Sequence, residues 1–355
     1  MPDAFDKLAF ETAQMARIGW FFGQKLLAAR LAKPVPVPDK LRGRKTPDRQ
    51  RLIRDLWQLV ERDWQHIAEG IYAPPDDWRG NPLDGLRRAA DFFADLRAVE
   101  ARRHGDLGER LMTEAPPERY PPYYRRKFHF QTDGYLSEAS AERYDYQVEV
   151  LFGGGAAAMR RQGLVPLRAA LLLHQGGAST ARLLDLGCGT GEFLREVKRN
   201  YPRLSVTGID LSAPYLRVAE RRLADWSRVR LVEAAAEAIP ASDASFDIVT
   251  ALYLFHELPG NVRQAVAAEI RRVLKPGGTL ILVDSLQTGD EPEYDALLDY
   301  FPYAFHEPYY ASYVREDLDR LFSPGFLRQM TVPAYFSKVV SWRRDESDSR
   351  SRPKM

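Results

Sequence analysis

Cysteine is nearly absent from this chain of 355 residues, which contains only Cys188. No intrachain disulfide can therefore form, and no cysteine cluster is available to bind zinc. Long hydrophobic runs are missing too, because no apolar stretch approaches the roughly 20 residues that a membrane helix needs. The first residues, MPDAFDKLAF, lack the basic segment and apolar run of a signal peptide. We therefore expect a cytoplasmic protein without a transmembrane segment.

The chain also lacks a strong excess of charge of either sign, since 51 Lys and Arg residues oppose 49 Asp and Glu residues. A general nucleic-acid binder usually carries a clear basic excess, so no nucleic-acid partner is expected. No two histidines stand at the spacing of metal ligands, and we expect no metal site. The six are His66, His104, His129, His174, His256 and His306.

The N-terminal part of the chain, residues 1–149, has helical patterning and predicts a helical domain. The stretch AFETAQMARIGWFFGQKLLAARLA, residues 9–32, has apolar residues at helical spacing and predicts an amphipathic helix packed on its own domain. An alternative is contact of residues 8–32 with a membrane surface, because Trp20, Phe21 and Phe22 stand beside cations. The following KPVPVPDK predicts an extended linker.

Further helices are expected within residues 47–113, where apolar residues recur three and four apart between prolines. An aromatic-rich segment follows and turns helical at SEASAERYDYQVEVLF, with Ser137 or Ser140 as its cap. This N-terminal domain is interpreted as a substrate lid or an interaction module.

From about residue 150 the pattern changes to short apolar strands that alternate with helices. This alternation predicts a parallel sheet with helices on both faces. Strands are expected at residues 182–186, 204–209, 229–233, 246–252 and 278–284. The charged tail, residues 343–355, has almost no apolar residue to bury and is expected to be disordered.

The first of these strands runs into a glycine-rich turn, LLDLGCGTGEF, which spans Leu183 to Phe193. Gly187, Gly189 and Gly191 there permit unusual backbone angles and let backbone N–H groups approach a ligand. The turn is not a P-loop, because no Lys-Ser or Lys-Thr pair follows it. It also departs from the dinucleotide pattern, since Glu192 stands where the third glycine should be. An acid there suits a cation better than a pyrophosphate.

A second acid, Asp210, stands at the end of the next strand in VTGIDLS, nineteen residues after Gly191. An acid in that place accepts hydrogen bonds from ribose hydroxyls. The two features together indicate a nucleoside with a cationic, phosphate-free extension. S-adenosylmethionine fits that description, and we expect it as the cofactor.

Four motifs taken together resemble those of class I S-adenosylmethionine-dependent methyltransferases. They are LLDLGCGTGEF, VTGIDLS, AAAEAIPASDASFDIVTALYLFHEL and RVLKPGGTLILVD, in the order and spacing of that family. The resemblance covers about residues 150–340, and within the family the sequence motifs are most similar to those of the ubiquinone/menaquinone C-methyltransferase type. It implies an α/β, doubly wound, mostly parallel, seven-stranded Rossmann-like sheet over residues 150–342.

The resemblance also implies which residues bind the cofactor. Its methionine part would be held by Asp185, Gly187, Cys188, Gly189 and Gly191, although Cys188 is expected to act mainly as a packing residue. Its adenosine part would be held by Asp210, Leu211, Ala235 and Ala236, and Leu252 would lie beneath the sulfonium. Many relatives have an acid where Ala235 stands, so Glu237 or a main-chain carbonyl would have to replace that contact.

His256 follows the fourth strand and is the expected general base, because an ordinary histidine pKa near ~6.5 suits proton transfer. The alternative is that His256 only caps or packs the next helix. Its neighbour Glu257 is expected to face solvent. The acceptor would meet a wall of aromatic residues, whose alternative role is packing under a lid. The candidate wall residues are His129, Tyr135, Tyr253, His306, Tyr309 and Tyr310.

The predicted function is methyl transfer from S-adenosylmethionine to a small-molecule acceptor. An RNA or protein methyltransferase is one alternative, weakly supported by ten Lys and Arg against five acids in residues 1–50. Against base methylation, ALYL stands where an NPPY-like motif would follow the fourth strand. A second alternative is a binding or assembly protein that keeps the cofactor fold without catalysis. Carbon, oxygen, nitrogen and sulfur acceptors and all oligomeric states stay open.

Overall fold

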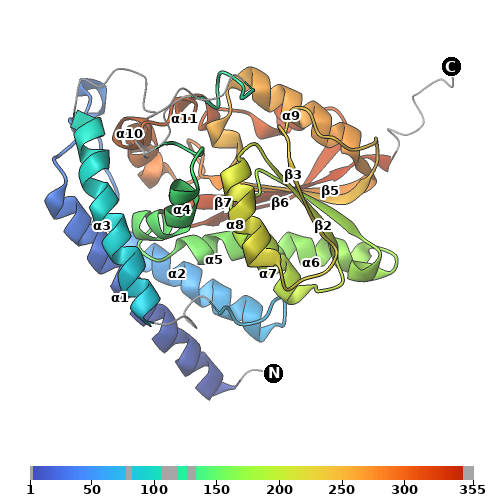
Figure 1. Ribbon diagram of the computed structural model, residues 1–355, viewed down its shortest axis with the longest axis horizontal. Coiled ribbons are helices and arrows are strands. Elements are labelled where there is room, and N and C mark those ends of the chain that lie inside the picture. Colours follow the sequence, from blue (N-terminus) through green and yellow to red (C-terminus); the bar gives the residue numbers. More distant parts are fainter. Residues whose placement is uncertain (1–2, 77–81, 105–118, 126–132, 347–355) are drawn as a thin grey trace. The chain divides into compact units, whose positions relative to one another are not determined.

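The computed structural model describes residues 3–76, 82–104, 119–125 and 133–346 (Figure 1). The chain divides into two compact units. Unit 1 comprises Met1–Arg160 and Glu293–Pro308, and unit 2 comprises Arg161–Pro292 and Tyr309–Met355. The segment 293–308 therefore leaves the second unit and groups with the N-terminal helices.

Unit 1 is helical in the part that the structure describes. Its helices are α1 (Ala4–Leu31), α2 (Arg49–Ala68), α3 (Pro82–His104), α4 (Glu138–Leu151), α5 (Ala156–Arg161) and α10 (Asp295–Phe305). The first begins with a capping box, in which Asp3 and Asp6 each accept a backbone N–H of the other. Of the two expected caps for α4, Ser137 is the one that accepts from a backbone N–H, that of Ser140.

The helix α1 forms where the sequence predicts it and packs within unit 1, but its buried face is a mixture of apolar and polar side chains. Phe10 and Phe21 are buried, yet so are the polar side chains of Gln14, Arg17 and Gln24. The reason lies in α4, which presents polar groups to α1. Glu149 pairs with Arg17 at 2.7 Å, and the Tyr146 hydroxyl donates to Gln24 at 2.8 Å.

Unit 2 contains a seven-stranded sheet of order β3-β2-β1-β4-β5-β7-β6, which confirms the predicted fold class. Strands β1 to β5 pair in parallel, whereas β7 is antiparallel to both β5 and β6. The strands are β1 (Arg182–Leu186), β2 (Ser205–Asp210), β3 (Val229–Glu233), β4 (Phe246–Leu252), β5 (Leu274–Ser285), β6 (Phe326–Ala334) and β7 (Ser337–Arg344). The tail was predicted to be disordered from residue 343, but Arg343 and Arg344 complete β7. The reason is that they continue the register opposite β5 and β6.

Helices lie on both faces of this sheet, with α9 above it and α6 and α7 below it in Figure 1. The helices of unit 2 are α6 (Leu164–Leu173), α7 (Glu192–Asn200), α8 (Ala213–Leu223), α9 (Gly260–Val273), α11 (Tyr310–Tyr313) and α12 (Leu318–Phe322). Leu183, Leu186, Ile248 and Val249 on the central strands are therefore buried, as expected for parallel strands covered on both sides. Such a sheet exposes its polar groups at the strand ends. In the part of the chain that the structure describes, no helix combines the length and apolar character needed to cross a membrane.

Gly208, in the middle of β2, lets α7 approach the sheet closely. A Cβ at this position would lie 2.8 to 2.9 Å from Cys188 Sγ, Leu194 Cδ1 and Leu231 Cδ2, which is closer than real contacts allow. Because the glycine turn precedes α7, this close packing also fixes the position of the turn.

We expect Gly208→Ala to destabilise unit 2 by about 1–3 kcal/mol, because the added methyl group overpacks a filled core. Gly260→Ala is the matched control, since a Cβ there has only Arg263 Nη2 nearby, at 3.6 Å. Thermal unfolding followed by circular dichroism compares the two variants. Equal midpoints for both would show that Gly208 is not required by packing.

Candidate functional site

The glycine turn after β1 has the unusual backbone that the sequence predicts. Gly187, Gly189 and Gly191 have φ values of 63°, 53° and 78°, in the left-handed region that favours glycine. Packing also requires two of them, because a Cβ at Gly187 or Gly191 would lie 3.1 Å from Leu254 or Ala219. A Cβ at Gly189 would meet nothing within 4 Å. The middle of the turn therefore borders open space.

Asp210, the last residue of β2, joins this turn to the next strand. Its carboxylate accepts the N–H of Gly189 at 2.9 Å and the N–H of Ser212 at 2.8 Å. Burial raises the pKa of Asp210 to about 6, although the two N–H groups oppose that rise. The nearby charge of Glu257 raises the pKa further. The ends of β1 and β2 thus meet at this half-buried acid, at the edge of the sheet where open α/β sheets bind their ligands.

Asp185 is a second acid at the same edge of the sheet, and it is buried. The hydroxyl of Thr250, on the neighbouring β4, donates to it at 2.6 Å. Burial raises the pKa of Asp185 to about 7, and the charge of Asp210 contributes to the rise. Among the described residues, neither Asp185 nor Asp210 has a cation within ion-pairing distance. A buried carboxylate without a cation is costly, so the pair favours a cationic ligand.

Two other residues at the turn, Cys188 and Glu192, interact with other residues of the chain. Cys188 is buried, and burial raises the pKa of its thiol well above the ordinary value. The thiol therefore stays protonated and acts as a packing group, as expected. Glu192 begins α7, and its carboxylate pairs with Arg222 at 3.0 Å. The cation beside this acid in the structure is thus an arginine of the chain.

The residues assigned to the adenosine follow β2 and β3 at the same edge. Leu211 and Ala235 are half-buried, and Ala236 is buried. The N–H of Ala234 donates to the Asp210 carbonyl, which ties this segment to β2. Contact of these residues with adenine, and its replacement by Glu237, stay predictions.

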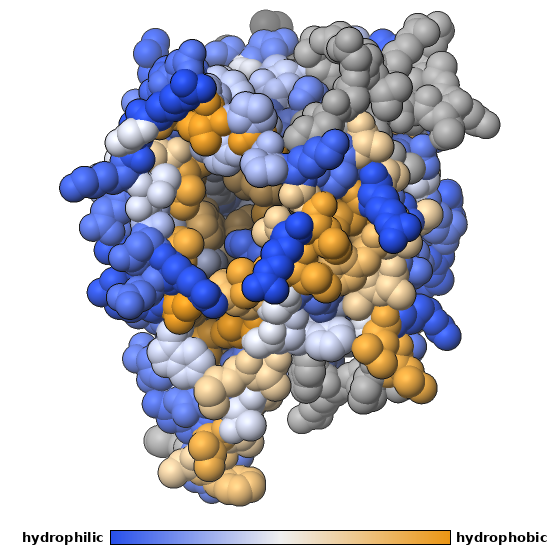
Figure 2. Space-filling view, turned by 90° about the vertical axis from the view of Figure 1, so that its left-hand side faces the viewer, coloured by the Kyte–Doolittle hydropathy of each residue, from blue (hydrophilic) through white to orange (hydrophobic). Residues whose placement is uncertain are grey.

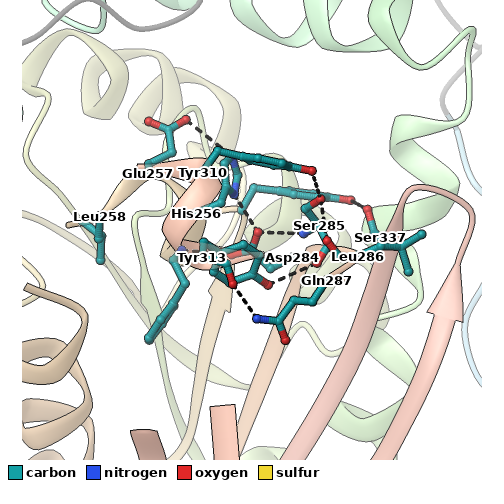
Figure 3. Close-up of polar contacts among 12 residues, drawn as sticks. His256, Glu257, Leu258, Asp284, Ser285, Leu286, Gln287, Tyr310, Tyr313 and Ser337 are labelled. Carbon is teal, nitrogen blue, oxygen red and sulfur yellow. Dashed lines mark hydrogen bonds and ion pairs between the residues drawn. The ribbon is translucent and has the colours of Figure 1, made fainter. Parts of the chain in front are cut away.

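His256 lies in a short 3₁₀ turn (Phe255–Glu257) after β4, and its ring is held by Asp284 at the end of β5 (Figure 3). The distance from His256 Nδ1 to Asp284 Oδ1 is 2.6 Å. Asp284 is fully buried and also accepts the N–H groups of Phe255 and Ser285, at 2.9 and 2.7 Å. A carboxylate only accepts, so Nδ1 carries the hydrogen and Nε2 is the nitrogen that can take up a proton.

Sequence reasoning did not find Asp284. The only signal was an acid at the carboxyl end of a predicted strand, in LILVDS. Its partnership with His256 depends on the register of β4 and β5, in which Leu252 lies opposite Val283.

Glu257 does not face solvent, so that expectation is wrong. Its side chain is only 13% exposed, and its Oε1 lies 3.9 Å from His256 Nε2. The tight 3₁₀ turn directs Glu257 toward the site, where its charge acts on Asp210.

Two tyrosines of α11 pack edge-on against the His256 ring. The ring centroids of Tyr310 and Tyr313 lie 5.9 and 6.2 Å from that of His256. The Tyr310 hydroxyl and the Ser285 Oγ are 2.5 Å apart, and the Tyr313 hydroxyl donates to the Ser285 carbonyl (Figure 3). Of the predicted wall residues, Tyr310 is therefore beside the candidate base, together with Tyr313 of the same aromatic segment.

The other predicted substrate residues have different surroundings. Tyr253, after β4, has φ of 54°, a strained conformation for a bulky residue, and its hydroxyl lies 3.0 Å from Ser337 Oγ. Tyr309 is half-buried at the start of α11, and His306 is exposed at the end of α10 in unit 1. His129 lies outside the described residues.

Tyr135 belongs to a row of tyrosine rings within unit 1. The ring centroids of Tyr124 and Tyr144 lie 6.0 and 5.9 Å from that of Tyr135, and Tyr120 extends the row at 5.6 Å from Tyr124. An aromatic row of this kind can hold a planar molecule.

A groove with a volume of about 410 Å³ lies elsewhere in unit 2. It is lined by residues of β1, β2 and β3 and by the segment 239–246, which forms no helix between β3 and β4. None of the predicted cofactor or substrate residues lines it. The groove is therefore separate from the site at the strand ends.

Comparison with known proteins gives matches to methyltransferases. Residues 183–278 match the family described as a methyltransferase domain. The chain is 33% identical over 151 residues to a demethylmenaquinone methyltransferase of Thermotoga maritima, covering 42% of this chain and 60% of that protein. It is 32% identical over 172 residues to the ubiquinone/menaquinone biosynthesis C-methyltransferase UbiE of Desulfotalea psychrophila, covering 47% and 64%.

The chain thus spans less than two thirds of the length of these curated relatives. Among solved structures, the N-methyltransferase NodS of Bradyrhizobium japonicum, in complex with S-adenosyl-L-homocysteine, covers 52% of this chain and 86% of its own. It has 18% identity and a TM-score of 0.40.

The raised pKa of Asp185 predicts a pH dependence of stability. Between about pH 4 and pH 7 the folded chain holds a proton that the unfolded chain has released, so the free energy of unfolding should fall as pH rises. The fall is at most about 1.4 kcal/mol per pH unit for one group. Asp185→Asn cannot ionise and still accepts from Thr250, so its stability should fall less over this window.

Unfolding midpoints from pH 5 to pH 8, without cofactor, check this difference. Asp225→Asn, which changes an exposed acid of the same unit, is the control and should follow the unmodified chain. Parallel curves for Asp185→Asn and the unmodified chain would contradict the assignment.

Proposed function

This chain carries a class I S-adenosylmethionine-dependent methyltransferase domain, and we propose that it transfers a methyl group from S-adenosylmethionine to a small-molecule acceptor. The observation that carries the proposal is a pair of acids, the buried Asp185 and the half-buried Asp210, which have no cation among the described residues and flank an open glycine turn. Glu257 adds a third carboxylate nearby. A sulfonium and an ammonium group on one nucleoside match this arrangement.

The residues of the site fit the parts of the cofactor. Backbone N–H groups of the turn and the carboxylate of Asp185 would hold its methionine part. The Asp210 carboxylate accepts two backbone N–H groups and has lone pairs left for the ribose hydroxyls. When bound, S-adenosylmethionine supplies the electrophilic methyl group, and the protein supplies alignment and exclusion of water.

We propose that His256 is the general base and that Asp284 positions it. Asp284 fixes the ring by its bond to Nδ1 and stabilises the imidazolium that forms when Nε2 takes the acceptor's proton. This pairing favours an acceptor whose reacting group carries a proton. A hydroxylated aromatic ring is such an acceptor, and the names of the relatives point to demethylated quinones as the first compounds to test.

Residues 1–149 are proposed to contribute to acceptor recognition. The support within unit 1 is the row formed by Tyr120, Tyr124, Tyr135 and Tyr144. The described residues give no support to the two alternatives, an RNA or protein acceptor and a role without catalysis. The buried His256–Asp284 pair instead favours proton transfer.

Asp210→Asn should weaken the binding of S-adenosylhomocysteine by about 10- to 100-fold, because hydrogen bonds to a charged acceptor contribute roughly 1.5–3 kcal/mol. Isothermal titration calorimetry measures the change, with Asp225→Asn as the control that should bind normally. Unchanged affinity in Asp210→Asn would remove this residue from the cofactor site.

His256→Asn should lower turnover by about 10²- to 10⁴-fold, the usual contribution of a general base, with cofactor affinity changed little. Asp284→Asn should lower turnover less, and the two losses should not add, because both residues act on one proton. The assay measures S-adenosylhomocysteine formation with a demethylated naphthoquinol as acceptor. Circular dichroism and cofactor binding check that each variant is folded.

His174 offers a matched control, because its Nδ1 lies 3.7 Å from Asp247 Oδ1 at the opposite, amino end of the strands. His174→Asn should leave turnover within about threefold. Full turnover in His256→Asn would show that this histidine only packs the helix, which is the alternative that the sequence left open.

A further inference from the structure

The outward face of α1 is apolar along most of its length. Between residues 8 and 27 none of its exposed residues is charged, in a chain with 28% charged residues. These residues are Leu8, Ala9, Thr12, Met15, Ala16, Gly19, Gly23, Leu26 and Leu27. The one polar group among them is used internally, since the Thr12 hydroxyl donates to the Leu8 carbonyl at 2.7 Å.

The exposure is large for apolar side chains, at 59% for Leu8, 52% for Met15 and 46% for Leu27. Figure 2 shows hydrophobic side chains gathered on the side of the molecule where α1 lies. The inward face of α1 is already occupied by apolar and polar contacts with α2 and α4. The outward face is therefore the unusual one, and contiguous exposed apolar surface of this kind marks an interaction site.

The exposed residues of this face recur with the seven-residue spacing found where two helices pack along each other. Phe5, Thr12, Gly19 and Leu26 recur every seven residues, as do Ala9, Ala16 and Gly23. The centre of this face consists of small residues. A Cβ at Gly19 or Gly23 would meet nothing within 4 Å, so a second helix could approach the backbone there.

We propose that two copies of this chain associate through the outward faces of their α1 helices, packed antiparallel. The charges at the two ends of α1 decide the partner and its direction. Asp3 and Asp6 are exposed at the start of the helix, and Arg30 and Lys33 are exposed at and just beyond its end. In an antiparallel pair each acidic end lies against the basic end of the partner, whereas a parallel pair places like charges together.

A two-fold axis between Ala16 and Gly19 places eight of these nine exposed residues opposite one another, and Met15 faces the half-buried Trp20 of the partner subunit. Leu8 then lies against the partner's Leu27, and Ala16 lies against the partner's Gly19. The small residues meet where the helices cross, and the leucines pack on either side, which makes the surface self-complementary. A membrane surface fits less well, because the face has no cation from residue 8 to residue 27 and begins beside two acids.

Gly19→Gln tests the interface without harming the folded chain. The new side chain starts in open space, and glutamine has a higher helix propensity than glycine. Gly85→Gln is the matched control, because Gly85 lies in α3 and a Cβ there also meets nothing within 4 Å. Sedimentation equilibrium of the full chain should show a dimer at micromolar concentration. The dissociation constant should rise at least tenfold in Gly19→Gln and not in Gly85→Gln.

Cross-linking tests the direction of the pair, because the only native cysteine is buried. The double variant Leu8→Cys with Leu27→Cys should form a disulfide between chains on mild oxidation, whereas Leu8→Cys alone should not. The two Leu8 positions lie about 28 Å apart in an antiparallel pair, given a helical rise of about 1.5 Å per residue.

A chain that stays monomeric at tens of micromolar would overturn the proposal, as would a Gly19→Gln variant that dimerises normally. Efficient cross-linking of Leu8→Cys alone would overturn the antiparallel arrangement. A monomer that sediments with phosphatidylglycerol vesicles would instead assign the face to a membrane surface. The proposal does not depend on the proposed function, because each of these measurements is made without cofactor or acceptor.

Discussion

The hydrogen bond from the Gly189 N–H to the half-buried Asp210 carboxylate is the interaction on which the site depends. It joins the turn after β1 to the end of β2, so these two elements cannot shift independently. The same carboxylate holds the start of α8 through the Ser212 N–H. Burial raises the pKa of this acid, and a ligand that supplies hydrogen-bond donors or positive charge would stabilise its ionised form.

The second half of the site is organised by another carboxylate, that of the buried Asp284. It accepts from the ring of His256 and from the backbone of Phe255, so it fixes both the histidine and the turn that carries it. Tyr253, just before that turn, has a strained positive φ. Strain of this kind persists only when the surroundings enforce it, and it concentrates at functional sites. The edge-on tyrosines Tyr310 and Tyr313 complete the enclosure of the histidine.

The two units differ in how well the sequence pattern predicts which side chains are buried. In unit 2 the apolar residues of the strands lie inside, and the predicted strands correspond to the observed ones within a few residues. In unit 1 the periodicity correctly predicts α1 as a helix but not which face it buries. Arg17 and Gln24 point inward because they form an ion pair with Glu149 and a hydrogen bond with Tyr146, both on α4. Apolar residues such as Leu8 and Leu27 are left outside, although an amphipathic pattern alone would place them in a core.

The sequence by itself determined the alternation of strands and helices up to β5, the glycine turn and the acid at the end of β2, because these can be read from periodicity, from glycine spacing and from the position of an acid after an apolar strand. It did not determine which side chains meet across elements. The pairing of His256 with Asp284, the inward direction of Glu257 and the partly polar inner face of α1 depend on strand register and on helix rotation. Those are properties of the packed structure, in which residues distant along the chain become neighbours, and no local pattern encodes them.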